Sequence, residues 1–362
     1  MKIFPSSLCD IYEGSISDGL KKVITDLNAS KLIIIADENT SALCVPKLQE
    51  ILNTDCLIIT RSGEQYKHLD SCKAIWSKMI EENVDRDSVV LNVGGGVICD
   101  MGGFTAACFQ RGIRFAHIPT TVLAMADAAI GGKLGVDHEG FKNYIGLIRN
   151  PTFIWIDKSF LETLPRTEII SGLAEIIKHA IIGSHDLWHL LSEVKGIEDI
   201  PWEKVFELNI PVKAGIVEKD PEDRGQRKML NFGHTIGHAL ESYCLSVNKP
   251  MSHGLCIYPG MLVESKISTV TGRLKKVDFE AIVEVIYRFW EPKELSLPGF
   301  EKVKPWLLGD KKKSRGKIGY SLPECIGSCS WDIVVEDQIV IESYEWLQAQ
   351  AKSVPFRLSV GD

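Results

Sequence analysis

Five short apolar runs alternate with helical stretches in the first half of the chain, and this alternation constrains the fold more than any other feature. The runs lie at 32–36, 57–60, 89–93, 115–118 and 153–156. Apolar strands separated by helices are typical of a parallel sheet whose two faces are both covered. We therefore expect an α/β domain built on a parallel sheet.

Residues suited to nucleotide binding follow several of these runs. Asp37 follows the first run, Gly94-Gly95-Gly96 the third and Pro119-Thr120-Thr121 the fourth. Ligands of open α/β sheets bind at these carboxyl ends, where glycines let backbone N–H groups approach a pyrophosphate beside a helix N-terminus. Asp37 is placed to hydrogen-bond ribose hydroxyls, which favours NAD over NADP. A plain tight turn is the alternative for the glycine run.

The pattern of apolar strands stops near residue 160, and helical stretches dominate from there to about residue 295. A chain of 362 residues suits two domains. We expect an α/β domain at 1–160 and a mainly helical domain at 161–362, packed closely with a cleft between them.

Composition excludes several classes of protein. The net charge of −7 argues against a general nucleic-acid binder. No apolar run reaches the roughly 18 residues that a membrane span needs, and the first residues lack the apolar core of a signal peptide. The ten cysteines are scattered without a CxxC pair, as expected of reduced thiols. We expect a cytosolic protein that binds neither membranes nor nucleic acid.

The segment 231–242 separates apolar from titratable residues with the period of a helix. His234, His238 and Glu241 fall on one side, and the apolar residues fall on the other. An i, i+4 histidine pair can hold a divalent cation or transfer protons. A solvated polar helix face is the alternative.

The segment 166–183 is apolar around most of a helix, so Glu175 and Lys178 within it should be buried and need partners. An i, i+3 ion pair between them is the simplest arrangement. Alternatively, Glu175 adds an anionic ligand to the two-histidine face, and His253 is a candidate for a further nitrogen. Two histidines and one glutamate leave coordination positions open, as catalytic zinc requires.

Cationic residues form a third group that includes Lys133, Lys142, Lys213 and the Asp310-Lys311-Lys312 segment. Scattered lysines are usually solvated surface. Arg227 and Asn231 differ, because they lie at i and i+4 just before His234. If the helix starts early enough, these three side chains converge into a site for a phosphate or carboxylate.

These residues make the chain resemble the 3-dehydroquinate synthase family along nearly its whole length. The most specific segments are Ala174-Glu-x-x-Lys178 and Asn231-x-Gly-His-Thr-x-Gly-His238, in this order. The Gly-Gly-Gly and Pro-Thr-Thr segments are less specific, since iron- and zinc-dependent alcohol and glycerol dehydrogenases carry similar ones. Further matches are Gly63–Lys67, Gly94–Asp100, Ile118–Thr121, Asp127, Gly131–Lys133, Lys142-Asn143, Gly172–Lys178, Arg227–His238, His253-Gly254 and Asp310–Lys312.

The resemblance implies a Rossmann-like NAD-binding α/β domain at 1–160, an all-α metal- and substrate-binding domain at 161–362, and an active site in the cleft between them. It also implies a homodimeric enzyme that uses NAD and a divalent metal, zinc or cobalt. Such enzymes convert the sugar phosphate 3-deoxy-D-arabino-heptulosonate 7-phosphate into 3-dehydroquinate and phosphate, in the shikimate pathway. NAD oxidises the C5 hydroxyl transiently, phosphate is eliminated, the hydride returns, and the ring opens and closes again by an intramolecular aldol step. NAD is therefore not consumed.

The resemblance also assigns roles to residues. Glu175, His234 and His253 would ligate the metal, so that His238 becomes a substrate-side group instead of a ligand. Arg111 would reach the phosphate of the neighbouring subunit. The other catalytic and substrate residues would be Asp127, Lys133, Lys142, Asn143, Lys178, Lys213, Arg227, Asn231 and Lys311 or Lys312. NAD would be held by Asp37, Asn39, Glu64, Lys67, Gly94, Gly95, Gly96, Val97, Asp100, Thr120 and Thr121, together with Asp127, Lys133 and Lys142.

Some positions depart from the family pattern. Ala128-Ala129 stand where serines are frequent, Leu134 replaces threonine, and Asp137 replaces asparagine. Leu255 replaces a glutamate that often follows His-Gly, which we expect to weaken the support of His253 and soften metal affinity.

Three other functions compete with this interpretation. A related cyclase would act on sedoheptulose 7-phosphate or glucose 6-phosphate, but the retained Lys142-Asn143, Arg227 and Asn231 favour a carboxylated substrate. An NAD-dependent metal polyol dehydrogenase would need no phosphate cluster and would release NADH. A nucleotide-sensing or scaffold protein would be expected to have lost one of the three metal ligands.

Overall fold

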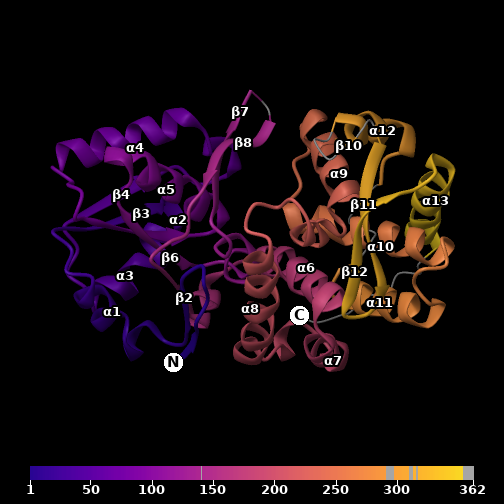
Figure 1. Cartoon of the computed structure of the whole chain (residues 1–362), viewed down its shortest axis with the longest axis horizontal. Helices are drawn as coiled ribbons and strands as arrows, with labels where there is room; N and C mark the ends of the chain where they lie inside the picture. The colour runs from indigo at the N-terminus through magenta and orange to yellow at the C-terminus, as the bar shows by residue number, and fades with distance from the viewer. Residues whose placement is uncertain (140, 291–296, 310–312, 315–316, 354–362) are drawn as a thin grey trace, which may run out of the picture. The chain divides into compact units, whose positions relative to one another are not determined.

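The structure, a computed structural model, describes residues 1–139, 141–290, 297–309, 313–314 and 317–353 (Figure 1). The chain forms two compact units. The N-terminal unit consists of Met1–Leu173 and Pro201–Asp223, and the C-terminal unit of Ala174–Ile200 and Arg224–Asp362. The division into domains at residue 160 stays a prediction.

A seven-stranded sheet forms the centre of the N-terminal unit, with strand order β1-β2-β9-β6-β5-β3-β4. All neighbouring strands are parallel except β1, which is antiparallel to β2. The five strands expected from the apolar runs are all present, so the predicted parallel sheet is confirmed. The strands are β1 (Lys2–Phe4), β2 (Asp10–Glu13), β3 (Leu32–Asp37), β4 (Cys56–Thr60), β5 (Val89–Gly94), β6 (Arg114–Pro119) and β9 (Phe153–Ile156).

Helices lie on both sides of this sheet (Figure 1). Residues Ile75 and Met101, from two of these helices, pack with Ile33, Val90 and Phe115 of the strands into one buried cluster. These strand residues are register partners and point to the same face of the sheet. Continuous apolar strands need helices on the other face as well. The helices are α1 (Leu20–Asp26), α2 (Glu38–Leu43), α3 (Val45–Gln49), α4 (Leu69–Glu81), α5 (Gly96–Cys108) and α8 (Trp202–Lys219), with short turns η1 (Ile16–Asp18), η2 (Glu64–Tyr66), η3 (Phe109–Arg111), η4 (Ala124–Ala128) and η5 (Lys158–Thr163).

A two-stranded hairpin, β7 (Lys133–His138) and β8 (Phe141–Ile148), was not expected from the apolar pattern. Its strands are short of continuous apolar residues, and most of β8 is exposed. Asp137 closes the hairpin, because its Oδ1 accepts a hydrogen bond from the backbone N–H of Asn143 at 2.7 Å. Asn143 has a positive φ of 50°. The carboxylate of Asp137 thus holds Asn143 in the left-handed conformation.

The C-terminal unit is mainly helical, as predicted, but it is not all-α. A three-stranded antiparallel sheet, with order β10-β11-β12, packs through β11 against α10. The prediction missed the β11–β12 hairpin because its residues alternate instead of forming an apolar run; Gly327, with φ of 87°, makes the turn. Helix α6 (Arg166–Gly183) begins in the N-terminal unit and continues into this one from Ala174. The other elements are α7 (His185–Glu193), η6 (Ile197–Asp199), η7 (Gln226–Asn231), α9 (His234–Ser246), α10 (His253–Val270), α11 (Lys276–Phe289), α12 (Phe300–Gly309), β10 (Lys313–Ser314), β11 (Lys317–Cys325), β12 (Ser328–Val334) and α13 (Asp337–Ser353).

Among the described residues, no helix is both long enough and apolar enough to span a membrane.

Candidate active site

Helices α6, α9 and α10 bring Glu175, His234 and His253 together. The Nε2 atoms of His234 and His253 lie 3.4 Å and 3.3 Å from the same oxygen, Oε1, of Glu175. Lys178, one turn further along α6, contacts the other oxygen, Oε2. The sequence left two alternatives for Glu175, a pair with Lys178 or contacts with the histidines. Both occur together. Glu175 is only 1% exposed.

The second nitrogen of each histidine is held by another group. Nδ1 of His234 lies 3.0 Å from the carbonyl oxygen of Phe232, and Nδ1 of His253 lies 3.5 Å from Oε2 of Glu241. A proton on each Nδ1 leaves both Nε2 lone pairs directed at Glu175. Neither oxygen of Glu175 accepts a well-formed hydrogen bond from the described residues.

This convergence of electron-rich atoms fits a divalent metal. Ligand atoms of a tetrahedral zinc site, at bond lengths of about 2.0–2.1 Å, are roughly 3.3–3.4 Å apart. The two Nε2–Oε1 distances, 3.4 Å and 3.3 Å, match that spacing. Without a cation or a proton, two lone pairs would face a buried carboxylate. The set of two imidazoles and one carboxylate is one of the donor sets that catalytic zinc uses.

Burial and neighbouring charges shift the pKa values of His234, His253 and Glu175 in different directions. Burial lowers the pKa of His234 to about 4, against the pull of Glu175. Burial also disfavours the charged form of His253, but contacts with the carboxylates of Glu175 and Glu241 raise its pKa to about 9. Burial opposes the ionisation of Glu175, yet the charge of Lys178 holds the pKa of that carboxyl well below its usual value. A metal bound between Glu175 and the two Nε2 atoms would replace the proton that these carboxylates favour on His253.

His238 lies beside both histidines. Its ring centroid is 5.1 Å from that of His234 and 5.5 Å from that of His253. The three histidines could also hold a metal, since ligand atoms of all three lie within 4.8 Å of one another. Contact with the anionic Glu175 favours His234 and His253 as the ligands, and His238 remains a predicted substrate-side group.

The helix that carries the histidine pair begins later than the sequence suggested. α9 starts at His234 after Gly233, whose φ is 79°, so Arg227 and Asn231 do not share its face. They lie instead on the 3₁₀ helix η7. The physical reason is the left-handed glycine between the two segments, which turns the chain and ends the helical period.

The sheet that the sequence analysis missed supports η7. Lys228 on η7 forms an ion pair with Asp332 of β12 at 2.7 Å, and its carbonyl oxygen accepts a hydrogen bond from Ser321 of β11 at 2.7 Å. Arg227, the neighbouring residue, is buried at 3% exposure. The antiparallel sheet therefore fixes the backbone that carries Arg227 and Asn231.

Two predicted substrate residues of the N-terminal unit, Asp127 and Lys213, meet at the turn η4. Lys213 on α8 forms an ion pair with Asp127 at 2.7 Å. Asn209, one turn earlier on α8, donates a hydrogen bond to the carbonyl of Ala126 at 2.9 Å. Lys133 at the start of β7 is exposed and pairs with Asp223 at 2.5 Å. α8 thus holds η4 at two points and sets the position of Asp127.

Four predicted cofactor residues form one network of charges. Lys67 is buried and lies 2.6 Å from Asp100 and 4.0 Å from Glu64. Lys142 on β8 reaches the same oxygen of Glu64 at 3.5 Å. Burial opposes the charge of Lys67, but Asp100 and Glu64 raise its pKa. Burial raises the pKa of Asp100, and Lys67 opposes this. The network links the hairpin β7–β8 to helix α5.

The glycine run ends β5 and begins α5, as predicted. A Cβ atom on Gly95 would lie 3.1 Å from Thr121, and one on Gly94 would lie 2.6 Å from the side chain of Ile98. Gly95 has an ordinary φ of −74°, so close packing rather than backbone conformation requires the glycine. No described side chain caps the N-terminus of α5. Its backbone N–H groups, next to Gly96, Val97 and Thr120, fit a dinucleotide phosphate.

Other predicted residues lie at the edges of these groups. Asp37 caps α2, since its Oδ1 accepts hydrogen bonds from the N–H groups of Asn39 and Thr40 at 2.9 Å and 2.8 Å. Among the described residues Oδ2 of Asp37 has no hydrogen-bond partner. Arg111 is exposed and has a left-handed φ of 69°. Lys311 and Lys312 lie outside the described residues.

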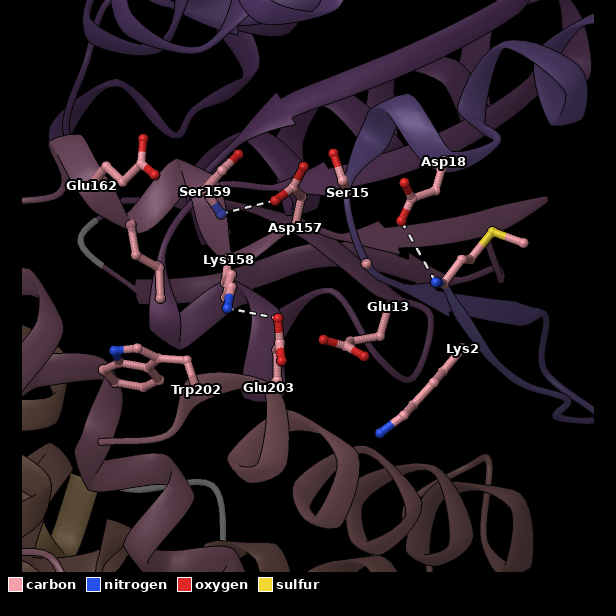
Figure 2. Close-up of a pocket in the computed structure, with 13 residues that line it drawn as sticks. Lys2, Glu13, Ser15, Asp18, Asp157, Lys158, Ser159, Glu162, Trp202 and Glu203 are labelled. Carbon is pink, nitrogen blue, oxygen red and sulfur yellow. Dashed lines mark hydrogen bonds and ion pairs between the residues drawn. The ribbon is translucent and has the colours of Figure 1, made fainter. Parts of the chain in front are cut away.

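A cavity of about 690 Å³ in the N-terminal unit lies elsewhere (Figure 2). Beside it Lys158 pairs with Glu203 at 2.6 Å, and Oδ1 of Asp157 accepts a hydrogen bond from the N–H of Ser159 at 2.8 Å. None of the predicted site residues lines this cavity. Because it lacks all of these residues, this cavity is not the candidate active site.

Sequence reasoning missed Glu264. This residue of α10 is 0% exposed, and its carboxylate accepts hydrogen bonds from three backbone N–H groups at the start of α9. The sequence did hold a sign of its burial, because Glu264 is a charged residue within the apolar stretch 253–270. The same pattern indicated that Glu175 on α6 is buried.

Comparison with known proteins decides the family. The models "3-dehydroquinate synthase N-terminal" and "3-dehydroquinate synthase C-terminal" match residues 57–171 and 172–313. The 3-dehydroquinate synthase of Pyrococcus abyssi is 36% identical over 89% of this chain and 95% of its own length. The chain belongs to the 3-dehydroquinate synthase family. The resemblance inferred from the sequence motifs is therefore confirmed.

Solved structures similar to this 3-dehydroquinate synthase family member agree on the fold. The 2-epi-5-epi-valiolone synthase of Streptomyces hygroscopicus subsp. jinggangensis 5008, with NAD⁺ and Zn²⁺ bound, is 23% identical and superposes with a TM-score of 0.85 over 97% of this chain and 99% of that one. A 2-deoxy-scyllo-inosose synthase complexed with carbaglucose-6-phosphate, NAD⁺ and Co²⁺ is 20% identical, with a TM-score of 0.82 over 95% and 99%. The α/β unit and the mainly helical unit are thus the fold of these cyclases.

Proposed function

We propose that the chain is a 3-dehydroquinate synthase, a phosphate-eliminating carbon–oxygen lyase of the shikimate pathway. Its substrate would be 3-deoxy-D-arabino-heptulosonate 7-phosphate. The observation that carries the proposal is the convergence of Glu175 Oε1 with the Nε2 atoms of His234 and His253 at 3.4 Å and 3.3 Å, in a chain of this family.

Two cofactors fit the residues present. Glu175, His234 and His253 would hold zinc or cobalt, and the N-terminus of α5 with the Lys67–Asp100 network would hold NAD. The neighbouring cyclase structures contain NAD⁺ with Zn²⁺ or Co²⁺, which supports this choice. When bound, the metal would polarise a substrate hydroxyl and NAD would accept and return a hydride.

The residues of the chain would bind the anionic ends of the substrate and move protons. Arg227 and the lysines Lys133, Lys178 and Lys213 would hold phosphate and carboxylate, since charged donors bind oxyanions most strongly. Asn143 and Asn231 would orient the substrate hydroxyls. His238, whose ring lies beside those of His234 and His253, would carry a proton at its imidazole nitrogen.

One assay tests the proposal. Purified protein is given the heptulosonate phosphate with zinc and a trace of NAD, and phosphate and 3-dehydroquinate are measured together. We expect both products in equal amounts, well beyond the amount of NAD, without accumulation of NADH. NADH formed in step with product would instead support a polyol dehydrogenase. Turnover of sedoheptulose 7-phosphate or glucose 6-phosphate in place of the heptulosonate would support a related cyclase.

We also propose a homodimer in which Arg111 reaches the phosphate bound by the partner subunit. Arg111 is exposed, as this role requires. Sedimentation should give twice the chain mass, and Arg111→Ala should reduce kcat/KM for the phosphorylated substrate without dissociating the dimer. A monomer with full activity would exclude this role.

A further inference from the structure

The metal-ligand candidate His253 has a second carboxylate beside it. Oε2 of Glu241 lies 3.5 Å from Nδ1 of His253, while Nε2 of the same ring lies 3.3 Å from Glu175. Glu241 lies on α9, two helical turns after His234, and α9 packs against α10, which begins at His253. The imidazole is thus held between carboxylates on opposite sides.

The carboxylate of Glu241 is buried at 4% exposure, so its contact with the imidazole is weakly screened. An anion beside Nδ1 favours the proton on that nitrogen. With a proton on Nδ1, Nε2 is the nitrogen that faces Glu175 and is left to bind a metal. The same contact fixes the plane of the ring.

We propose that Glu241 positions His253 for metal binding. The inference rests on the proposed metal site and adds to it a residue that is not itself a ligand. Leu255, two residues after His253, offers no acceptor, and the softening expected from it is offset because a carboxylate from the neighbouring helix supports the same ring.

Zinc affinity of the purified apo chain, measured by competition with a chromophoric chelator, tests the proposal without using activity. We expect Glu241→Ala to weaken zinc binding by about 10- to 100-fold, the range for loss of a group that orients a ligand. Glu241→Gln keeps an oxygen acceptor for Nδ1 and should stay within a fewfold of the unaltered chain. Cys244→Ala, a buried truncation one turn later on α9, should leave zinc affinity unchanged.

The outcomes separate the two levels of inference. If the unaltered chain binds one zinc ion, that ion is lost in Glu175→Gln, and Glu241→Ala binds zinc as tightly as the unaltered chain, only the role of Glu241 is wrong. If the unaltered chain binds no zinc, the proposed metal site is wrong, and so is the role of Glu241.

If Glu241→Ala does not fold, Glu241→Asp tests the same role. Its shorter side chain withdraws the carboxylate from His253, and we expect about tenfold weaker binding. Unchanged affinity there would overturn the proposal.

Discussion

The carboxylate of Glu264 accepts a hydrogen bond from the backbone N–H of Gly233 at 2.7 Å, across 31 residues of sequence. Its other oxygen accepts hydrogen bonds from Thr235 and Ile236 at 3.1 Å and 3.2 Å. Gly233, at the N-cap of α9, has no side chain to satisfy these donors. The cap therefore comes from α10, and it fixes the first turn of α9, which carries His234.

Replacement of Glu264 by Gln should destabilise this cap. The amide offers one acceptor oxygen and places an NH₂ group against backbone donors, so at least one buried N–H loses its partner. We expect the free energy of unfolding to fall by about 1–3 kcal/mol, and zinc affinity to fall with it, as measured by denaturant titration and chelator competition. Ser268→Ala, which removes a buried hydrogen bond elsewhere on α10, is the control. It should lower stability alone, and equal zinc loss in both variants would contradict the role of the cap.

Replacement of Glu175 by Gln should remove the metal. The neutral amide lacks the charge that balances a dication between two imidazoles. We expect metal analysis to show loss of the bound ion and turnover to stop, while NAD affinity is retained because its predicted residues lie in the other unit. Glu168→Gln, on the same helix but outside the cluster, should keep both metal and activity. Full activity in a chelated, metal-free preparation would disprove the assignment.

Replacement of Arg227 by Lys should weaken use of the substrate. The guanidinium can grip an oxyanion with two parallel hydrogen bonds, whereas lysine offers a point charge. We expect kcat/KM to fall by an amount equivalent to about 1.5–3 kcal/mol, with metal content and NAD affinity unchanged. Arg273→Lys, at a half-exposed ion pair with Glu324, is the matched control. An Arg227 variant with normal kinetics, or with a parallel loss of NAD binding, would show that Arg227 does not face the substrate.

His117 makes the N-terminal unit sensitive to acid. Burial lowers the pKa of His117 from its usual 6.5 to about 3, and the ring lies 3.3 Å from Nδ2 of Asn92. Below pH 6.5 His117 takes up a proton in the unfolded chain but stays neutral in the folded chain. Stability is therefore complete above that value and is lost as the pH falls toward about 3, by about 1.4 kcal/mol per pH unit. Denaturant titrations across this range should show a shallower slope for His117→Gln, which cannot take up a proton. Identical slopes would assign the acid sensitivity to other groups.

The sequence by itself determined the parallel sheet, the glycine turn and the buried helix that carries Glu175. These features are local: continuous apolar strands and a helix apolar around its circumference can each be buried in few ways. The motifs around Glu175 and His234 likewise indicated the family before any fold was known.

Only the tertiary structure decided which carboxylates lie beside the candidate ligands. Glu241 lies 3.5 Å from His253, and Glu264 accepts hydrogen bonds at the start of α9, so both contacts join α9 to α10. Sequence periodicity also did not predict two other features. One is the sheet that holds η7, and the other is the left-handed Gly233 that separates Arg227 from α9. The physical reason is that a charged residue in an apolar segment indicates that it will be buried and must be paired. Which residue pairs with it depends on how the helices pack.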